Sequence, residues 1–192
     1  MAYAFDTRTS HTQTASDSEL IQIAIRGEPS GFEQLVLRYY DKLHTSLSIN
    51  VGCPCAAEDI VQDAWMKAFT NLEKLRDHGQ FYSWLYRIAL NSRRTYVPSK
   101  HRSLQLGSIE ESRIRPRAKR NESPSEIAER NEECRRVRLA LAKIDPLHRT
   151  ILILREYELY DYESIAKVMQ TNTGTVRSRL HRARRKLKER LE

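Results

Sequence analysis

Cysteine, glycine, proline and long apolar runs are all scarce in this sequence. Its 192 residues include three Cys, six Gly and six Pro, which excludes a disulfide framework, a collagen-like repeat and a low-complexity chain. The longest apolar run is five residues, Met1–Phe5, whereas a membrane-spanning helix needs about 20. We therefore expect no membrane insertion. The few cysteines, and a Ser/Thr-rich start without an apolar signal core, predict a cytoplasmic protein.

Motifs of enzyme chemistry are missing as well. The sequence contains no P-loop, no glycine pattern for a dinucleotide, no HExxH and no nucleophile motif, and its six histidines are scattered. We therefore expect no enzymatic activity, no cofactor and no metal. The period-two alternation of a half-buried strand is also absent, so the expected fold class is all-α.

Positive charge is abundant and unevenly placed. The net charge is +8, and residues 173–192 alone carry eight cations and two anions. A smaller basic excess lies in residues 101–124. A basic block of this kind suits nucleic acid, although a solvated helix face has the same composition.

Apolar residues recur at steps of three and four along most of the chain, which is the period of amphipathic helices. Glycines, prolines and capping residues mark where these helices begin and end. In the first half the expected helices are 18–27, 31–52, 56–72 and 80–96, and in the second half they begin near residues 125, 146, 162 and 175.

The helical period is lost in the middle of the chain, where prolines and charges replace large apolar residues. Such a composition is typical of a linker. The expected organisation is two small helical domains, 17–100 and 124–192, joined by a flexible linker, 101–123, and preceded by a disordered tail, 1–16.

A helix-turn-helix is predicted between Asp161 and Leu187. Ala166 is small where two helices must cross closely, and Asn172 or Thr173 can cap the second helix. Its inner face is apolar and its outer face carries Arg177, Ser178, His181, Arg182, Arg184 and Arg185. Arg, Ser and His can bond base edges in a major groove, so this pattern favours duplex DNA binding over two packed helices with a solvated basic face. Gln170 stands where many such motifs have Gly.

The segment Gln80–Lys100 combines five aromatic residues with four cations and has no acidic residue. Flat rings stack on unpaired bases while cations follow the backbone, which is how single strands are held. Asn91, among the cations, can bond the edge of an extruded base. An ordinary apolar core explains most of the same rings, so both interpretations stay open on chemistry alone.

Three stretches of the chain resemble one family. Phe81–Asn91 (FYSWLYRIALN) is similar to the promoter-melting helix of bacterial extracytoplasmic-function (group IV) sigma factors. Gly174–Arg184 (GTVRSRLHRAR) resembles the recognition helix of that family, and Ala57–Trp65 (AEDIVQDAW) its helix that binds core RNA polymerase. The three occur in the family's order and spacing, and the strings are most similar to the envelope-stress sigma-E-like subgroup.

The resemblance implies a transcription initiation factor that binds core RNA polymerase, at the β′ clamp and the β subunit, and melts the −10 element. The linker is expected to thread the polymerase cleft, and a flipped base to enter a pocket between Leu75–Gln80 and the helix that carries Asn91. An anti-sigma factor, often membrane-bound in this family, is the expected inhibitor.

The same resemblance assigns roles residue by residue. The residues expected to bind core polymerase are Asp59, Gln62, Asp63 and Trp65. The residues expected to bind the single-stranded −10 element are Leu75, Arg76, His78, Tyr82, Arg87, Asn91, Arg93 and Arg94. The residues expected to read the duplex −35 element are Arg177, Ser178, His181, Arg182 and Arg185.

Two alternatives remain at this point. A stand-alone helix-turn-helix regulator accounts for the C-terminal domain, but it leaves residues 56–100 unexplained. Cys53-Pro54-Cys55 departs from the general family pattern and could sense a metal or a redox change. Two cysteines are fewer than the four ligands of a structural zinc site, so an incidental turn is the other interpretation.

Overall fold

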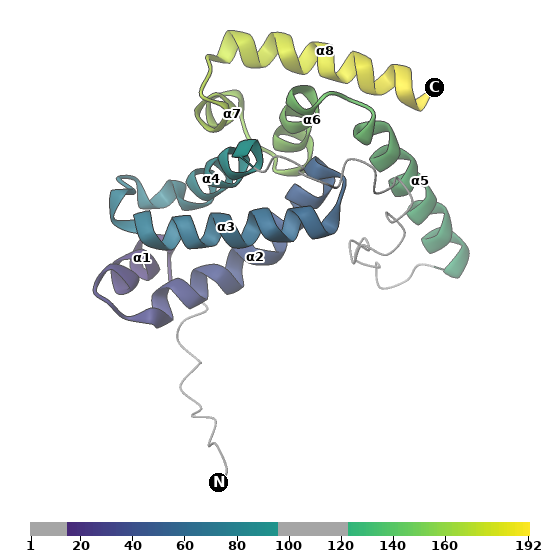
Figure 1. Ribbon diagram of the computed structural model, residues 1–192. Helices are drawn as coiled ribbons and strands as arrows, with labels where there is room; N and C mark the ends of the chain where they lie inside the picture. Colours follow the sequence, from purple (N-terminus) through teal and green to yellow (C-terminus); the bar gives the residue numbers. More distant parts are fainter. Residues whose placement is uncertain (1–14, 96–122) are drawn as a thin grey trace.

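The computed structural model describes residues 15–95 and 123–192 (Figure 1). Within these ranges there are helices and no strands, which confirms the all-α expectation. None of the helices described is long and apolar enough to cross a bilayer. The elements are α1 (Asp17–Ile25), α2 (Pro29–Val51), α3 (Pro54–Asn71), η2 (Leu72–Lys74), η3 (His78–Gln80), α4 (Phe81–Thr95), α5 (Pro124–Ala142), α6 (Pro146–Leu152), η6 (Ile153–Tyr157), α7 (Tyr162–Met169) and α8 (Thr173–Leu191).

Local capping chemistry sets most of the helix starts. The Ser16 hydroxyl accepts a hydrogen bond from the Glu19 amide, and the Glu19 carboxylate in turn accepts one from the Ser16 amide. This reciprocal pair satisfies two backbone donors that a helix start leaves open, so α1 is capped by Ser16 rather than beginning at Ser18. The other side-chain caps of α-helices are Ser123, Asp145, Asp161 and Asn172.

Two glycines are required by the path of α2. A β-carbon on Gly31 would lie 2.7 Å from the Ala24 amide nitrogen, so α1 and α2 cross backbone to backbone at this point. Gly52 takes the left-handed conformation, with φ of 77°, and ends α2. Because α3 begins at Pro54, two residues before the expected start, Cys55 lies in its first turn rather than in a connecting turn.

The N-terminal domain consists of α1 to α4, which pack in chain order, α1 on α2, α2 on α3 and α3 on α4. Its core is rich in rings. Phe81 and Tyr86 on α4 are fully buried, and Trp65 on α3 meets the Phe32 ring edge to face at 5.6 Å. Phe81 and Tyr86 lie on the apolar face of α4, so the interpretation of its aromatic residues as ordinary core holds for these two.

The C-terminal domain places α5, α6 and α7 against the long helix α8. Arg149, buried on α6, links α6 to the end of α5 and to the residues between these two helices. Its Nη2 donates to the carbonyl oxygens of Ala142 and Ile144, at 2.7 and 2.9 Å. Its Nη1 donates to the Asn50 carbonyl oxygen at 2.8 Å, and Asn50 belongs to α2 of the other domain.

The two domains pack on each other. Helix α4 lies beside α7, and α2 lies against α5, α6 and η6 (Figure 1). Their buried apolar residues form one continuous cluster. The expected linker lies outside the described residues except for Ser123, and the expected tail except for Ala15 and Ser16.

Candidate nucleic-acid interface

One face of α8 carries all the residues that sequence analysis assigned to duplex DNA. Asn172 Oδ1 accepts a hydrogen bond of 2.7 Å from the Thr175 amide and fixes the start of the helix. The inner residues Val176, Leu180 and Ala183 are buried. The outer residues Arg177, Ser178, His181, Arg182 and Arg185 are exposed to solvent. This geometry is the one a helix needs to enter a major groove.

The turn before α8 has an unusual occupant. Gln170 adopts φ of 52° and ψ of 52°, the left-handed conformation that favours glycine. Its amide closes the end of α7 by bonding the Ala166 and Lys167 carbonyl oxygens. The departure from glycine noted in the sequence therefore leaves the geometry of the turn intact and adds backbone strain to it.

Two other cations of α8 form ion pairs within the C-terminal domain. Arg184 Nη2 lies 2.7 Å from Glu156 Oε1 on η6, and Lys186 Nζ lies 2.7 Å from Asp145 Oδ2 at the start of α6. Arg179 is half-buried. The basic block thus divides into an outer set open to solvent and a set that anchors the helix.

Asp145 is the most strongly perturbed carboxylate of this domain. Partial burial alone raises its pKa. The hydrogen bonds from Lys186 and from His148 outweigh that effect and hold the pKa of Asp145 well below its usual range. Asp145 also accepts the His148 amide as the cap of α6. The Asp145 carboxylate therefore has two structural roles: it caps α6 and it holds α8 through Lys186.

The residues assigned to the −10 element fall into exposed and covered groups. Arg76 is exposed, and His78 Nδ1 lies 3.3 Å from Ser18 Oγ. Leu75 and Tyr82 are each only 8% exposed. Burial, and then the nearby Glu158 carboxylate, raise the pKa of Tyr82 far above its usual value. Leu75 and Tyr82, which were expected to contact bases, are therefore largely covered in this structure.

Two cavities flank α4. A cavity of about 190 Å³ is lined by Leu75 and Gln80 of the loop and by Arg87. Asn91 does not line it. Asn91 lies instead on a second cavity of about 500 Å³, with Lys67 and Lys74 from the α3 side. The two cavities share Trp84 as a common wall, and the first of them lies where the flipped-base pocket was expected, between the loop and α4.

Sequence analysis missed the two lysines of the second cavity. Lys67 Nζ bonds Asp63 Oδ2 at 2.6 Å and Ser92 Oγ at 3.0 Å, so it bridges α3 and α4 beside Asn91. Lys74 donates to Asn71 Oδ1 at 2.7 Å. They come from a segment with no aromatic–basic pattern, and only the packing of α3 on α4 brings them to Asn91.

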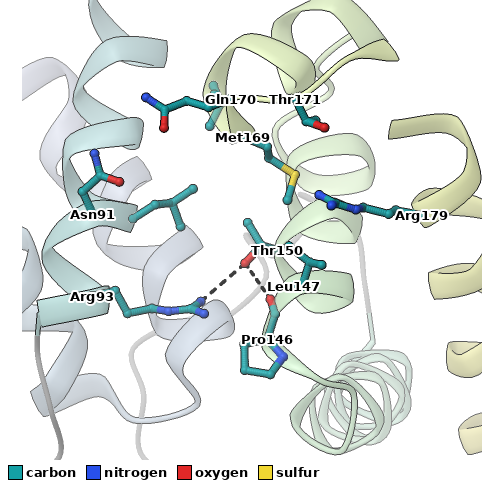
Figure 2. Close-up of a pocket in the computed structure, with 11 residues that line it drawn as sticks. Asn91, Arg93, Pro146, Leu147, Thr150, Met169, Gln170, Thr171 and Arg179 are labelled. Carbon is teal, nitrogen blue, oxygen red and sulfur yellow. Dashed lines mark hydrogen bonds between the residues drawn. The ribbon is translucent and has the colours of Figure 1, made fainter. Parts of the chain in front are cut away.

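A third cavity, of about 540 Å³, lies between the two domains and also touches Asn91. Figure 2 shows Asn91 and Arg93 on one wall, and Gln170 and Arg179 of the C-terminal domain across from them. Arg93 bonds Asn50, and its Nη1 reaches Thr150 Oγ1 at 3.4 Å. Arg93 is therefore engaged at the domain boundary, and the side chain of Arg94 lies outside the described residues.

The residues assigned to polymerase binding share α3 but differ in exposure. Asp59 and Gln62 are exposed, and Asp63 is half-buried. Trp65 is 7% exposed and packs in the core, and its indole nitrogen has no hydrogen-bond partner among the described residues. Asp59 and Gln62 are therefore accessible on the surface of α3, whereas Trp65 supports the helix from the core.

The Cys53-Pro54-Cys55 motif surrounds the start of α3. Cys53 is the cap residue but makes no side-chain capping bond. All three cysteines, Cys134 included, are free thiols. Among the described residues no group of His, Cys, Asp or Glu is arranged to hold a metal ion. The sensor interpretation gains no support from this geometry.

Comparisons with known proteins cover almost the whole chain. The profile described as Sigma-70 region 2 matches residues 33–103, and the one described as Sigma-70, region 4 matches residues 134–187. The RNA polymerase sigma-H factor of Pseudomonas aeruginosa is 34% identical, over 92% of this chain and 94% of its own. The ECF RNA polymerase sigma-E factor of Escherichia coli is 33% identical, over 90% and 93%.

Solved structures give the same result. CnrH, in complex with the cytosolic domain of CnrY, matches with a TM-score of 0.64 at 27% identity, over 90% of this chain and 95% of its own. The sigma factor RpoE of Bartonella quintana, in complex with the anti-sigma factor NepR, matches with a TM-score of 0.62 at 26% identity, over 83% and 96%. The outward basic face of α8, the two matched regions and these relatives show that the chain belongs to the sigma-70 family and is an extracytoplasmic-function sigma factor, a transcription initiation factor.

Proposed function

We propose that this sigma factor divides promoter recognition between its two domains. The exposed face of α8, with Arg177, His181 and Arg182, reads the duplex −35 element. Helix α4 and the cavity beside Asn91 hold the melted −10 strand. The observation that carries the proposal is that Asn91 lines a cavity together with Lys67 and Lys74. An amide to bond a base edge and cations to follow phosphates are what a single strand requires.

Polymerase binding is assigned to α3. Asp59 and Gln62 lie three residues apart and so share a helix face, and both are exposed. We assign this face to the clamp of the β′ subunit, with the C-terminal domain meeting the β subunit. The factor itself supplies binding and strand capture, and the polymerase supplies the chemistry.

Control by an anti-sigma factor is part of the same proposal. Two structural relatives were solved with their partners, CnrY and the anti-sigma factor NepR. CnrY is described there by its cytosolic domain, which supports a membrane-anchored inhibitor here. We assign the protein to the cytoplasm, where such an inhibitor and core polymerase can both reach it.

Reconstituted transcription tests the function. Core polymerase plus the full chain should initiate specific transcripts on genomic DNA, and the chain without core should not shift the promoters it selects. Asn91→Ala should reduce permanganate reactivity of the −10 thymines several-fold while closed complexes still form. Gln34→Ala, a half-buried amide on α2 away from the cavity, is the matched control. Equal melting by Asn91→Ala and wild type would remove Asn91 from the site, and promoter shifts without core would indicate a stand-alone regulator.

A further inference from the structure

One group of polar contacts between the two domains centres on Glu158, which follows η6. Its side chain is fully buried. Its Oε1 accepts a hydrogen bond from the Tyr82 hydroxyl at 3.0 Å, and its Oε2 lies 3.2 Å from Lys42 Nζ. Lys42 Nζ also lies 4.3 Å from the centre of the Tyr82 ring. One carboxylate of the C-terminal domain is therefore held by a lysine of α2 and a tyrosine of α4.

The backbone is strained at the residue that follows. Leu159 has φ of 59°, which is unfavourable for a bulky side chain, and it is 78% exposed. On its far side, the Tyr160 hydroxyl accepts a hydrogen bond from Ser83 Oγ at 3.3 Å. The Leu159 side chain thus points into solvent, while Glu158 and Tyr160 on either side of it contact the N-terminal domain. Backbone strain of this kind persists where the surrounding contacts enforce it.

These contacts cover the face that the proposed function gives to single-stranded DNA. Tyr82 is assigned to that strand and is buried under Glu158. Lys167 and Val168 of α7 close the cavity next to Leu75. On the side of Asn91 that faces the C-terminal domain, residues of that domain line the third cavity across from it (Figure 2), whereas the cavity that Asn91 shares with Lys67 and Lys74 is lined by the N-terminal domain.

The duplex-reading face is left open in the same structure. Arg177, His181 and Arg182 are all exposed on α8. The packing of the domains therefore treats the two DNA faces differently, closing one and leaving the other free.

We propose that Glu158, supported by Tyr160 and α7, is an internal acidic competitor for the single-strand face of the N-terminal domain. The Glu158 carboxylate occupies a lysine and a tyrosine hydroxyl, and these two groups could otherwise bind a backbone phosphate of DNA. In the closed chain the duplex-reading helix is available, and the part of the single-strand face around Tyr82 and Leu75 is occupied. Core polymerase must hold the two domains apart if the −10 and −35 elements are to be bound together. That separation frees the single-strand face. This inference rests on the function proposed for α4.

The test compares two glutamates in the full chain. Glu158→Gln keeps the shape of the side chain and removes the charge that Lys42 faces. Glu156→Gln is the matched control, since it makes the same change of charge two residues away, where the partner is Arg184 of the same domain. Tyr160→Phe removes the bond to Ser83 without any change of charge and serves as an independent second variant.

Two measurements are made without polymerase. Small-angle X-ray scattering reports the separation of the domains, and fluorescence anisotropy reports binding of a labelled 15-nucleotide single strand of mixed sequence and of its duplex. Relative to Glu156→Gln, Glu158→Gln should increase the radius of gyration and tighten single-strand binding about fivefold or more. Duplex binding should match the control within about twofold. Tyr160→Phe should move the single-strand result in the same direction by a smaller factor.

Each other outcome overturns the inference. Equal scattering and equal single-strand affinity for both glutamine variants would show that Glu158 closes nothing. A wild-type chain already as extended as separated domains would exclude the closed form. A radius of gyration that grows with concentration would make a second copy the partner. Transcription by wild-type holoenzyme is scored separately, so failure of the proposed function is distinguishable from failure of the closed form alone.

Discussion

Asn50 and Thr150 are buried partners across the domain boundary, with Asn50 Nδ2 donating to Thr150 Oγ1 at 3.0 Å. Arg93 joins both, so an amide of α2, a hydroxyl of α6 and a guanidinium of α4 form one small network. The two residues lie 100 positions apart in the chain. The stability of the packed form therefore depends on polar contacts that neither domain can make alone.

Thr150→Val should test this network directly. The substitution keeps the volume and leaves the buried Asn50 amide without its acceptor, which costs about 1–3 kcal/mol of unfolding free energy. Urea denaturation of the full chain measures the change. Thr70→Val is the control, because the Thr70 hydroxyl is exposed and its hydrogen bonds, to two helix carbonyl oxygens and from the Asn71 side-chain amide, all lie within α3. Equal stability of the two variants would mean that the domains are apart in solution.

The polymerase face of α3 is tested by Asp59→Ala combined with Gln62→Ala. We expect the affinity for core polymerase to fall by about tenfold or more, the effect of removing important contacts in an interface. Helical circular dichroism should stay at the wild-type value, since both residues are exposed. Gln22→Ala with Glu73→Ala, an exposed amide and carboxylate on other elements, is the control. Unchanged core affinity of the α3 variant would move the polymerase contact to another face.

On the duplex-reading helix, Arg182→Ala and Lys188→Ala should behave differently. Loss of a base contact costs roughly 1–3 kcal/mol and relaxes preference at one position, so Arg182→Ala should change the ranking of −35 variants. Lys188 lies further along and pairs with Glu192 at 3.4 Å. Its loss should weaken all sequences alike and lower the salt slope by about one unit. Promoter-variant transcription by holoenzyme at two salt concentrations measures both. A ranking that survives Arg182→Ala would reduce α8 to a basic surface.

The low pKa of Asp145 makes a prediction about pH. A carboxylate whose pKa is depressed on folding stabilises the fold above its unfolded pKa, near 3.9, and loses that contribution as the pH falls toward the folded value. Asp145→Asn keeps a good capping residue but loses the charge that Lys186 pairs with. It should lower stability by about 0.5–1 kcal/mol at pH 7, the scale of a partly exposed ion pair. The difference from wild type should shrink toward pH 3 in thermal unfolding, and a pH-independent difference would refute the ion-pair explanation.

The turn before α8 offers a stabilising substitution. Gln170→Gly should raise the unfolding free energy by about 0.5–1 kcal/mol, because glycine adopts the left-handed conformation without the clash of a β-carbon. Gln170→Val should lower it, since a β-branched residue tolerates positive φ poorly. Urea titration of both variants decides the sign. If Gln170→Gly is the less stable of the two, the left-handed turn is not the conformation of the protein in solution.

Local chemistry explains how much of the fold the sequence could predict. Asp145-Pro146 and Asn172 mark helix starts through bonds to residues three positions away, and the structure has both. The cap of α1 was misplaced by two residues, because Ser18 competes with Ser16 for the same pattern and only the reciprocal bond with Glu19 decides between them. The outward face of α8 was likewise predictable, since period and charge alone determine it.

The covered residues could not be predicted in this way. The helical period shows which residues share a face of the helix with Tyr82. It carries no information about which residues of other elements pack against that face. Here the partner is the Tyr39 ring, stacked at 5.0 Å, together with Glu158, 76 residues away. The separation of Asn91 from the Leu75 cavity has the same origin, since it depends on where the bulk of Trp84 falls between two helices.

The close crossing at Gly31 has a consequence for how the protein opens. A helix of nine residues, such as α1, is too short to persist alone in water. Its fully buried Leu20 and Ile21 dock through a backbone contact that leaves no side chain at Gly31 to rearrange. Intermediate positions of α1 are therefore unavailable, and the helix is either docked or unfolded. Its amide hydrogens should exchange with solvent together, as one cooperative unit with a single opening free energy.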